Sequence, residues 1–228
     1  EAGSISKAVE LVVKATENKN SIYIFGASHA GILTQEMYYR AGGMITFNPI
    51  FASAVSLERT PITSTSKMER LEGYGKVISD NMDFKDGDIL FLHSVSGRNP
   101  IIIDLALEAR KKGVKIIALT NLKYTKSVTS RHTSKKKLFE VSDVVIDNHG
   151  DIGDACCIID NSSGRKAGPS STVVGATILN EIVVEAAQKL VHSNVEDIPI
   201  FYSANLDNGD ILNSELVEKY KSQIHYNF

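Results

Sequence analysis

Residues 88–104 read Asp88-Ile-Leu-Phe-Leu-His-Ser-Val-Ser-Gly-Arg-Asn-Pro-Ile-Ile-Ile-Asp104 and contain the clearest structural pattern in the chain. Its apolar run, residues 89–92, has the length of one buried strand. Small polar residues follow, and Pro100 stands where the first turn of a helix accepts proline. The pattern predicts a strand, a tight loop and a helix N-terminus, whose free N–H groups and partial positive charge suit an anion, above all a phosphate. We therefore expect this loop to hold a phosphorylated small molecule.

A second junction of the same kind lies earlier in the chain. Residues 21–25 form a β-rich run without alternation, typical of a strand covered on both faces. The loop Gly26-Ala-Ser-His-Ala-Gly31 follows, and a helix is expected over residues 32–40. Ser28 is placed to cap that helix or to hold an anion. Because ligands gather at the carboxyl ends of parallel strands, we expect the two loops to form one site.

The rest of the chain continues this alternation of strands and helices. We expect strands at residues 44–47, 114–119 and 144–146, and helices at 4–17, 100–112, 168–190 and 213–221. Residues 67–83 are expected to be largely helical, with a break near Gly73 and Gly75. Residues 48–66 have no clear period, so they form either a long ordered excursion or a helix with a weak pattern. The alternation predicts right-handed βαβ units and a mostly parallel sheet. It also predicts a single domain over residues 1–228, with a C-terminal extension at 196–228.

Composition restricts the classes of function. The chain has 228 residues, 43% of them apolar and 23% charged, as in a globular domain, and its net charge of -2 gives no field to recruit nucleic acid or an anionic membrane. No apolar run approaches the roughly 20 residues that span a bilayer, and residues 1–7 show no signal peptide. The adjacent Cys156 and Cys157 predict two reduced, packed thiols in a cytoplasmic protein. Neither a metal nor another cofactor is expected, because metal-ligand spacings and nucleotide-binding glycine loops are absent.

The two loops resemble those of the sugar isomerase (SIS) domain family. The resemblance covers residues 21–190 and rests on Gly26-Ala-Ser-His-Ala30, Ser94-Val-Ser-Gly-Arg-Asn-Pro100, residues 109–120 and Gly168-Pro-Ser-Ser-Thr172. Within the family the chain is similar to a phosphosugar-binding subgroup described as phosphoheptose isomerases. The features shared with that subgroup are residues 37–43, 127–132 and 168–175.

The resemblance implies an α/β fold and a ligand. The fold is a flavodoxin-like, three-layer α/β/α sandwich with a five-stranded parallel sheet, in a homodimer or homotetramer with sites near subunit interfaces. The implied ligand is a sugar phosphate, bound by Ser28, Ser94, Ser96, Gly97, Arg98, Asn99, Ser170, Ser171 and Thr172. In many members a serine or threonine stands where this chain has Asn99, so one hydroxyl to the phosphate is lost.

Isomerising an aldose phosphate to a ketose phosphate requires a base beside the carbonyl carbon and an acid for the oxygen. The catalytic candidates are Glu36, His29 and His93. Glu36 can instead pair with Arg40 at the i,i+4 spacing, and each histidine can be an ordinary hydrogen-bonded residue. The late helix has no histidine before His192, where phosphoheptose isomerases place one.

Three functions therefore stay open. The first is an aldose–ketose phosphosugar isomerase similar to phosphoheptose isomerases. The second is a non-catalytic phosphosugar sensor or regulator, and the third is a phosphosugar ether lyase. Residues 120–137 are polar and basic, and this basic segment, which contains His132, is either a lid over the phosphate or a solvated loop.

Overall fold

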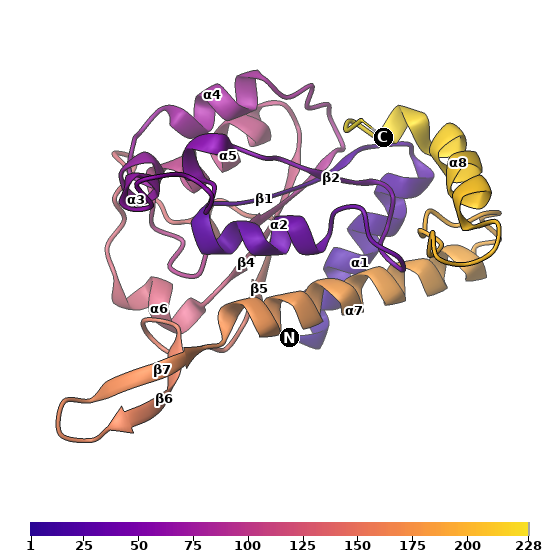
Figure 1. Cartoon of the computed structure of the whole chain (residues 1–228). Helices are drawn as coiled ribbons and strands as arrows, with labels where there is room; N and C mark the ends of the chain where they lie inside the picture. The colour runs from indigo at the N-terminus through magenta and orange to yellow at the C-terminus, as the bar shows by residue number, and fades with distance from the viewer. Residues whose placement is uncertain (228) are drawn as a thin grey trace.

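The computed structural model describes residues 1–227 and contains a parallel sheet of five strands in the order β2-β1-β3-β4-β5 (Figure 1). The strands are β1 (Ile22–Gly26), β2 (Phe47–Pro49), β3 (Ile89–His93), β4 (Lys115–Thr120) and β5 (Val144–Asp147). All four pairings are parallel. The predicted flavodoxin-like sheet is thus confirmed.

Helices cover both faces of this sheet (Figure 1). The α-helices are α1 (Ala2–Glu17), α2 (Ile32–Glu36), α3 (Thr63–Glu69), α4 (Tyr74–Asp80), α5 (Pro100–Lys111), α6 (Leu122–Ser127), α7 (Ser171–His192) and α8 (Gly209–Tyr220). Short 3-10 turns lie at Ser28–Gly31, Ser53–Val55, Leu138–Glu140 and Lys221–Gln223.

The residues of β3 show why the sheet is buried on both sides. Ile89 and Phe91 pack into one core with α1 and α7, whereas Leu90 and Leu92 pack into a second core with α4 and α5. Successive side chains of a strand point to opposite faces, so a continuous apolar run fits a strand between two helical layers. The three-layer architecture follows from this pattern.

Several predicted boundaries shift. The helix expected over 32–40 ends at Glu36, because the chain turns at Tyr39, where φ is 40°. The second strand occupies Phe47–Pro49 instead of residues 44–47. The break expected near Gly73 and Gly75 is confirmed at Gly73, whose φ of 90° is left-handed, so that α3 and α4 are separate; the first of these helices begins at Thr63 instead of Lys67.

The expectation of two packed thiols is wrong. Cys156 and Cys157 are exposed on an antiparallel hairpin, β6 (Ala155–Asp160) with β7 (Arg165–Pro169), which projects from the body beside the start of α7 (Figure 1). The sequence run is apolar, yet Ile158 and Ile159 are 59% and 63% exposed. The apolar run at residues 155–159 predicted burial, but no other helix or strand within residues 1–227 covers this hairpin.

The C-terminal extension packs against the edge of the sheet. The Asn48 side chain beside β1 donates to the Gln223 carbonyl at 2.8 Å and accepts from the His225 N–H at 2.6 Å. The His225 ring stacks on Tyr23 of β1. Phe228, the last residue of the predicted extension, lies outside the described residues.

Candidate functional site

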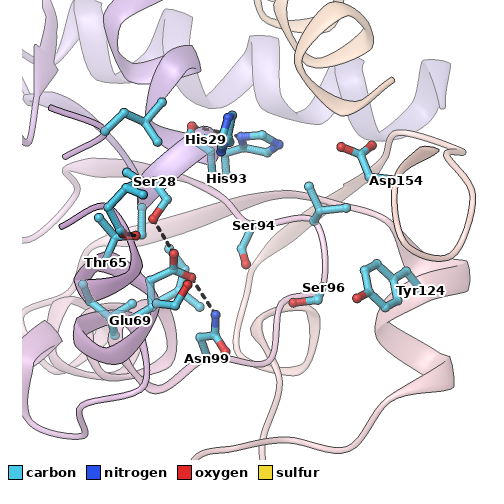
Figure 2. Close-up of a pocket in the computed structure, with 18 of the residues that line it drawn as sticks. Ser28, His29, Thr65, Glu69, His93, Ser94, Ser96, Asn99, Tyr124 and Asp154 are labelled. Carbon is cyan, nitrogen blue, oxygen red and sulfur yellow. Dashed lines mark hydrogen bonds between the residues drawn. The ribbon is translucent and has the colours of Figure 1, made fainter. Parts of the chain in front are cut away.

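The two loops predicted to meet do so because β1 and β3 are neighbours in register. Gly26 at the end of β1 lies opposite His93 at the end of β3. A cavity of about 450 Å³ opens between the loops that follow these strands (Figure 2). The predicted site residues that line it are Ser28, His29, His93, Ser94, Ser96 and Asn99.

The loop between β3 and α5, residues 94–99, carries the Ser-x-Ser-Gly motif and turns sharply before α5; we call it the motif loop. Gly97 has a φ of 57° and its N–H donates to the Ser94 hydroxyl at 3.2 Å. Pro100 begins α5, and Asn99, at the N-cap, makes no side-chain cap bond to the helix. The start of α5 therefore lacks the side-chain acceptor that usually satisfies its free N–H groups, which is the arrangement that binds anions.

Glu69, from α3, is the central residue that the sequence analysis missed. Its carboxylate accepts a hydrogen bond from the Ser28 hydroxyl at 2.5 Å and from the Asn99 side-chain amide at 2.7 Å (Figure 2). One donor comes from each loop. The pattern of residues 67–83 indicated a helix but gave no sign that it would reach the cavity.

His93 lines the cavity and has one ring nitrogen that is buried without a hydrogen-bond partner in residues 1–227. Its side chain is buried, and Nδ1 lies 3.1 Å from the Ala30 carbonyl oxygen. A carbonyl only accepts, so Nδ1 carries the hydrogen and Nε2 holds a lone pair, which has no hydrogen-bond partner within residues 1–227. Burial lowers the pKa of His93, and a neutral ring follows near neutral pH.

Tyr124 and Asp154 form the opposite wall (Figure 2). The Asp154 carboxylate accepts the Ser171 N–H at 2.9 Å and the Ser171 hydroxyl at 2.7 Å, so it caps the start of α7. Ser170, Ser171 and Thr172 do not line the cavity. The resemblance implied ligand contacts from these three residues, whereas the structure brings Asp154, the acid that caps α7, to the cavity.

Glu36 also lies away from the cavity. Its carboxylate pairs with Arg40, one turn along the chain, and accepts a hydrogen bond from the Asn180 side chain of α7 at 3.0 Å. Of the two interpretations of Glu36, catalytic base or i,i+4 partner of Arg40, the structure shows the ion pair. Gly97 and Arg98 belong to the motif loop without lining the cavity.

The basic segment packs behind the motif loop. The Arg131 N–H donates to the Arg98 carbonyl at 3.0 Å, and Leu138 N–H donates to the Gly97 carbonyl at 2.9 Å. The Arg131 guanidinium donates to the Asn99 side-chain oxygen at 2.8 Å. The side-chain nitrogen of Asn99 thus donates to Glu69, and its side-chain oxygen accepts from Arg131.

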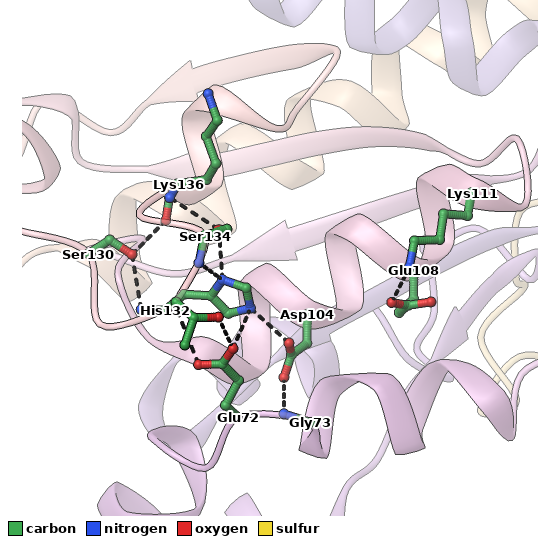
Figure 3. Close-up of polar contacts among 10 residues, drawn as sticks. Glu72, Gly73, Asp104, Glu108, Lys111, Ser130, His132, Ser134 and Lys136 are labelled. Atoms are coloured by element: carbon green, nitrogen blue, oxygen red, sulfur yellow. Dashed lines mark hydrogen bonds and ion pairs between the residues drawn. The ribbon is translucent and has the colours of Figure 1, made fainter.

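His132 anchors this segment to α5 (Figure 3). Its buried ring lies 2.9 Å from Asp104 Oδ1 through Nε2, while Nδ1 accepts the Ser134 N–H at 3.0 Å. The second Asp104 oxygen accepts the Gly73 N–H at 2.6 Å. The segment is therefore joined to α5 and to the α3–α4 turn, and none of residues 128–137 lines the cavity.

A search of residues 1–227 finds no group of three or more His, Cys, Asp or Glu side chains that could hold a metal ion. Within the same residues, none of the helices combines the length and apolar character needed to cross a membrane.

Comparison with known proteins assigns the family. A family model described as the SIS domain matches residues 1–121. A UPF0309 protein of Shouchella clausii is 51% identical over 222 residues, covering 97% of this chain and 89% of that protein. A UPF0309 protein of Oceanobacillus iheyensis is 53% identical, with the same coverage.

Solved structures show weaker similarity. A phosphoheptose isomerase from Francisella tularensis aligns with a TM-score of 0.48 and 17% identity, over 82% of this chain and 86% of that one. The Vibrio vulnificus NanR protein complexed with ManNAc-6P aligns with a TM-score of 0.44 and 18% identity, over 96% and 60%. These scores are too low to assign an activity. The family match and the two close relatives show that the chain belongs to the SIS domain family and to the UPF0309 proteins.

Proposed function

We propose that the cavity binds a phosphorylated sugar. The observation that carries this proposal is the position of the Glu69 carboxylate, an oxyanion held by one donor from each loop, Ser28 and Asn99. Donors that hold a carboxylate can also hold a phosphate. Membership of a sugar isomerase family supports the sugar part of the proposal, and a cavity of about 450 Å³ is large enough for such a ligand.

In this proposal the phosphate lies on the motif loop. The hydroxyls of Ser94 and Ser96 and the free N–H groups at the start of α5 bind its oxygens, and Ser28 donates from the other loop. The phosphate takes the Asn99 amide from Glu69, because two oxyanions compete for the same donor. The remainder of the sugar then extends toward His29 and His93.

One observation favours catalysis beyond binding. His93 lines the cavity, and its neutral Nε2 is a base with no partner in residues 1–227; this atom is buried, so in our proposal the ring turns toward the ligand before it acts. As base, it would take the proton from the carbon next to the aldehyde of the open-chain sugar and return it to the aldehyde carbon. A hydroxyl proton moves from one oxygen to the other at the same time, so an aldose becomes a ketose without change in composition.

The proposal is tested by binding measurements on the purified chain. A panel of hexose, heptose and amino-sugar phosphates is screened by thermal shift, and each hit is titrated by calorimetry. We expect at least one sugar phosphate to bind, and Ser94→Ala/Ser96→Ala to remove binding while keeping the circular dichroism spectrum. A panel without any hit, or a double variant that binds normally, would overturn the proposal.

Turnover is measured separately in D2O by NMR. An isomerase exchanges the proton next to the carbonyl for deuterium and forms the ketose, and His93→Asn stops both. A bound sugar phosphate that stays unchanged over a long incubation leaves a sensor or regulator as the function. The phosphosugar resemblance also leads us to propose a homodimer or homotetramer in the cytoplasm, and sedimentation would measure the assembly.

A further inference from the structure

Three arginines gather on the side of Asn99 that faces the basic segment. Arg98 precedes Asn99 in the motif loop, and Arg70 follows Glu69 at the end of α3. The Arg131 backbone N–H donates to the Arg98 carbonyl, and its guanidinium donates to Asn99, whose amide bonds Glu69, the neighbour of Arg70 in the chain. We call Arg70, Arg98 and Arg131 the arginine cluster.

The cluster is held in place from behind. His132, next to Arg131, is buried against Asp104 of α5, and its neighbour Thr133 donates its N–H to Glu72 at 3.1 Å (Figure 3). Glu72 lies in the turn that follows Arg70. These contacts fix the backbone next to Arg131 and just after α3, from which the exposed side chains of Arg131 and Arg70 extend.

The positive charge of the cluster is not balanced by ion pairs. Elsewhere in residues 1–227, Arg40 pairs with Glu36 and Arg110 with Asp143, whereas no member of the arginine cluster forms an ion pair. The Nε of Arg98 is buried without a hydrogen-bond partner in that range. Burial, followed by the charges of Arg98 and Arg70, lowers the pKa of Arg131. Like charges held together in this way cost free energy unless an anion joins them.

We infer that the ligand carries a second anionic group, a carboxylate or another phosphate, which the arginine cluster binds while the motif loop holds the first phosphate. The inference rests on the proposed function and narrows it to sugar phosphates with two separate anionic groups. Guanidinium groups suit this task because their planar donors bind carboxylate or phosphate oxygens in pairs. Asn99 lies between the two anion sites, since it contacts Glu69 on one side and Arg131 on the other.

Matched ligand pairs test this inference by calorimetry. Sorbitol 6-phosphate is compared with 6-phosphogluconate, which adds a carboxylate, and fructose 6-phosphate with fructose 1,6-bisphosphate, which adds a phosphate. We expect the dianionic member of at least one pair to bind about tenfold more tightly or better. The pair that shows the preference identifies the second group.

Variants test whether the arginine cluster causes the preference for the dianionic ligand. Arg70→Gln/Arg131→Gln is expected to abolish it, while weakening the binding of the monophosphate less than that of the dianionic ligand, since Arg131 also holds the Asn99 side chain. Arg165→Gln, which removes one positive charge from the exposed strand β7, is the control and keeps the preference. Equal affinity within both pairs overturns the inference, and so does an equal loss of monophosphate binding in the double variant, which would assign the arginines to the first phosphate. If none of the four sugar phosphates binds and the wider panel also fails, the proposed function itself is refuted.

Discussion

The side-chain amide of Asn99 donates a hydrogen bond to the Glu69 carboxylate, with Nδ2 and Oε2 2.7 Å apart. The two residues belong to different elements, the motif loop and α3. In many SIS proteins a hydroxyl residue occupies the position of Asn99, as the family resemblance implies. Here an amide donates to an oxyanion from that position, so the substitution preserves a donor. The Asn99 N–H group that we assign to the phosphate is therefore bonded to Glu69 in this structure.

Glu69→Gln is expected to raise the affinity for the best-binding sugar phosphate by about three- to tenfold, because it removes a negative charge that competes for Ser28 and Asn99. Calorimetry measures the change. Glu181→Gln, on the exposed side of α7, is the control for a lost negative charge. Weaker binding in Glu69→Gln would mean that the carboxylate itself contacts the sugar.

Gly97→Ala tests the shape of the motif loop. At Gly97 φ is 57°, and an added Cβ would lie 3.2 Å from the Thr125 hydroxyl and 3.3 Å from the Leu138 Cβ. Gly164→Ala is a matched control, since Gly164 has a φ of 66° with nothing nearby. The left-handed backbone alone costs about 1–2 kcal/mol of unfolding free energy.

We therefore expect urea unfolding to show a larger loss for Gly97→Ala than for Gly164→Ala, and only the former to weaken sugar phosphate binding. Equal losses in both measurements would show that the crowding around Gly97 has no effect on the loop.

The buried neutral His93 predicts a dependence of stability on pH. Because its pKa is lowered in the folded chain, the unfolded chain binds a proton first as the pH falls below about 6.5. The stability that this residue contributes is therefore present above pH 6.5 and decreases with acidification, by up to about 1.4 kcal/mol per pH unit.

His93→Asn keeps a donor for the Ala30 carbonyl and removes the titration. Chemical unfolding between pH 7 and pH 5 should show a shallower decline for this variant than for the native chain. His192→Gln, at the exposed end of α7, should leave the slope unchanged. Parallel slopes for His93→Asn and the native chain would contradict a neutral His93.

His132→Ala tests the anchor of the basic segment. The substitution leaves the buried Asp104 with the Gly73 N–H but without its imidazole partner, so we expect a loss of about 1–3 kcal/mol in unfolding free energy. Segment 128–137 should also become susceptible to limited trypsin digestion. Thr129→Ala, in the same segment but exposed, is the control. Unchanged stability and unchanged digestion would show that the segment is held by other contacts.

The sheet and its two ligand-facing loops could be predicted from local patterns. Residues 89–92 are apolar without alternation because helices cover both faces of β3, and Pro100 marks the first turn of α5. The ends of β1 and β3 meet because parallel neighbours share an edge. Each of these features is encoded within a few residues, which makes it readable from the sequence.

The chemistry of the cavity depends on contacts between distant segments. Glu69 reaches Ser28 and Asn99 only because α3 folds back over the loops from an excursion without periodicity. Asp154, from the turn before the hairpin, accepts the Ser171 N–H at the start of α7, where we expected Ser170, Ser171 and Thr172 to contact the ligand. Local spacing carries no information on either contact, and for the same reason it could not place Glu36 beside Asn180.

The most direct test of phosphate binding by the motif loop is a crystal structure of the chain with its best-binding sugar phosphate. The account predicts phosphate oxygens within hydrogen-bond distance of the Ser94 and Ser96 hydroxyls and the first N–H groups of α5, with Asn99 released from Glu69. A phosphate bound elsewhere, with Glu69 still bonded to both Ser28 and Asn99, would contradict it.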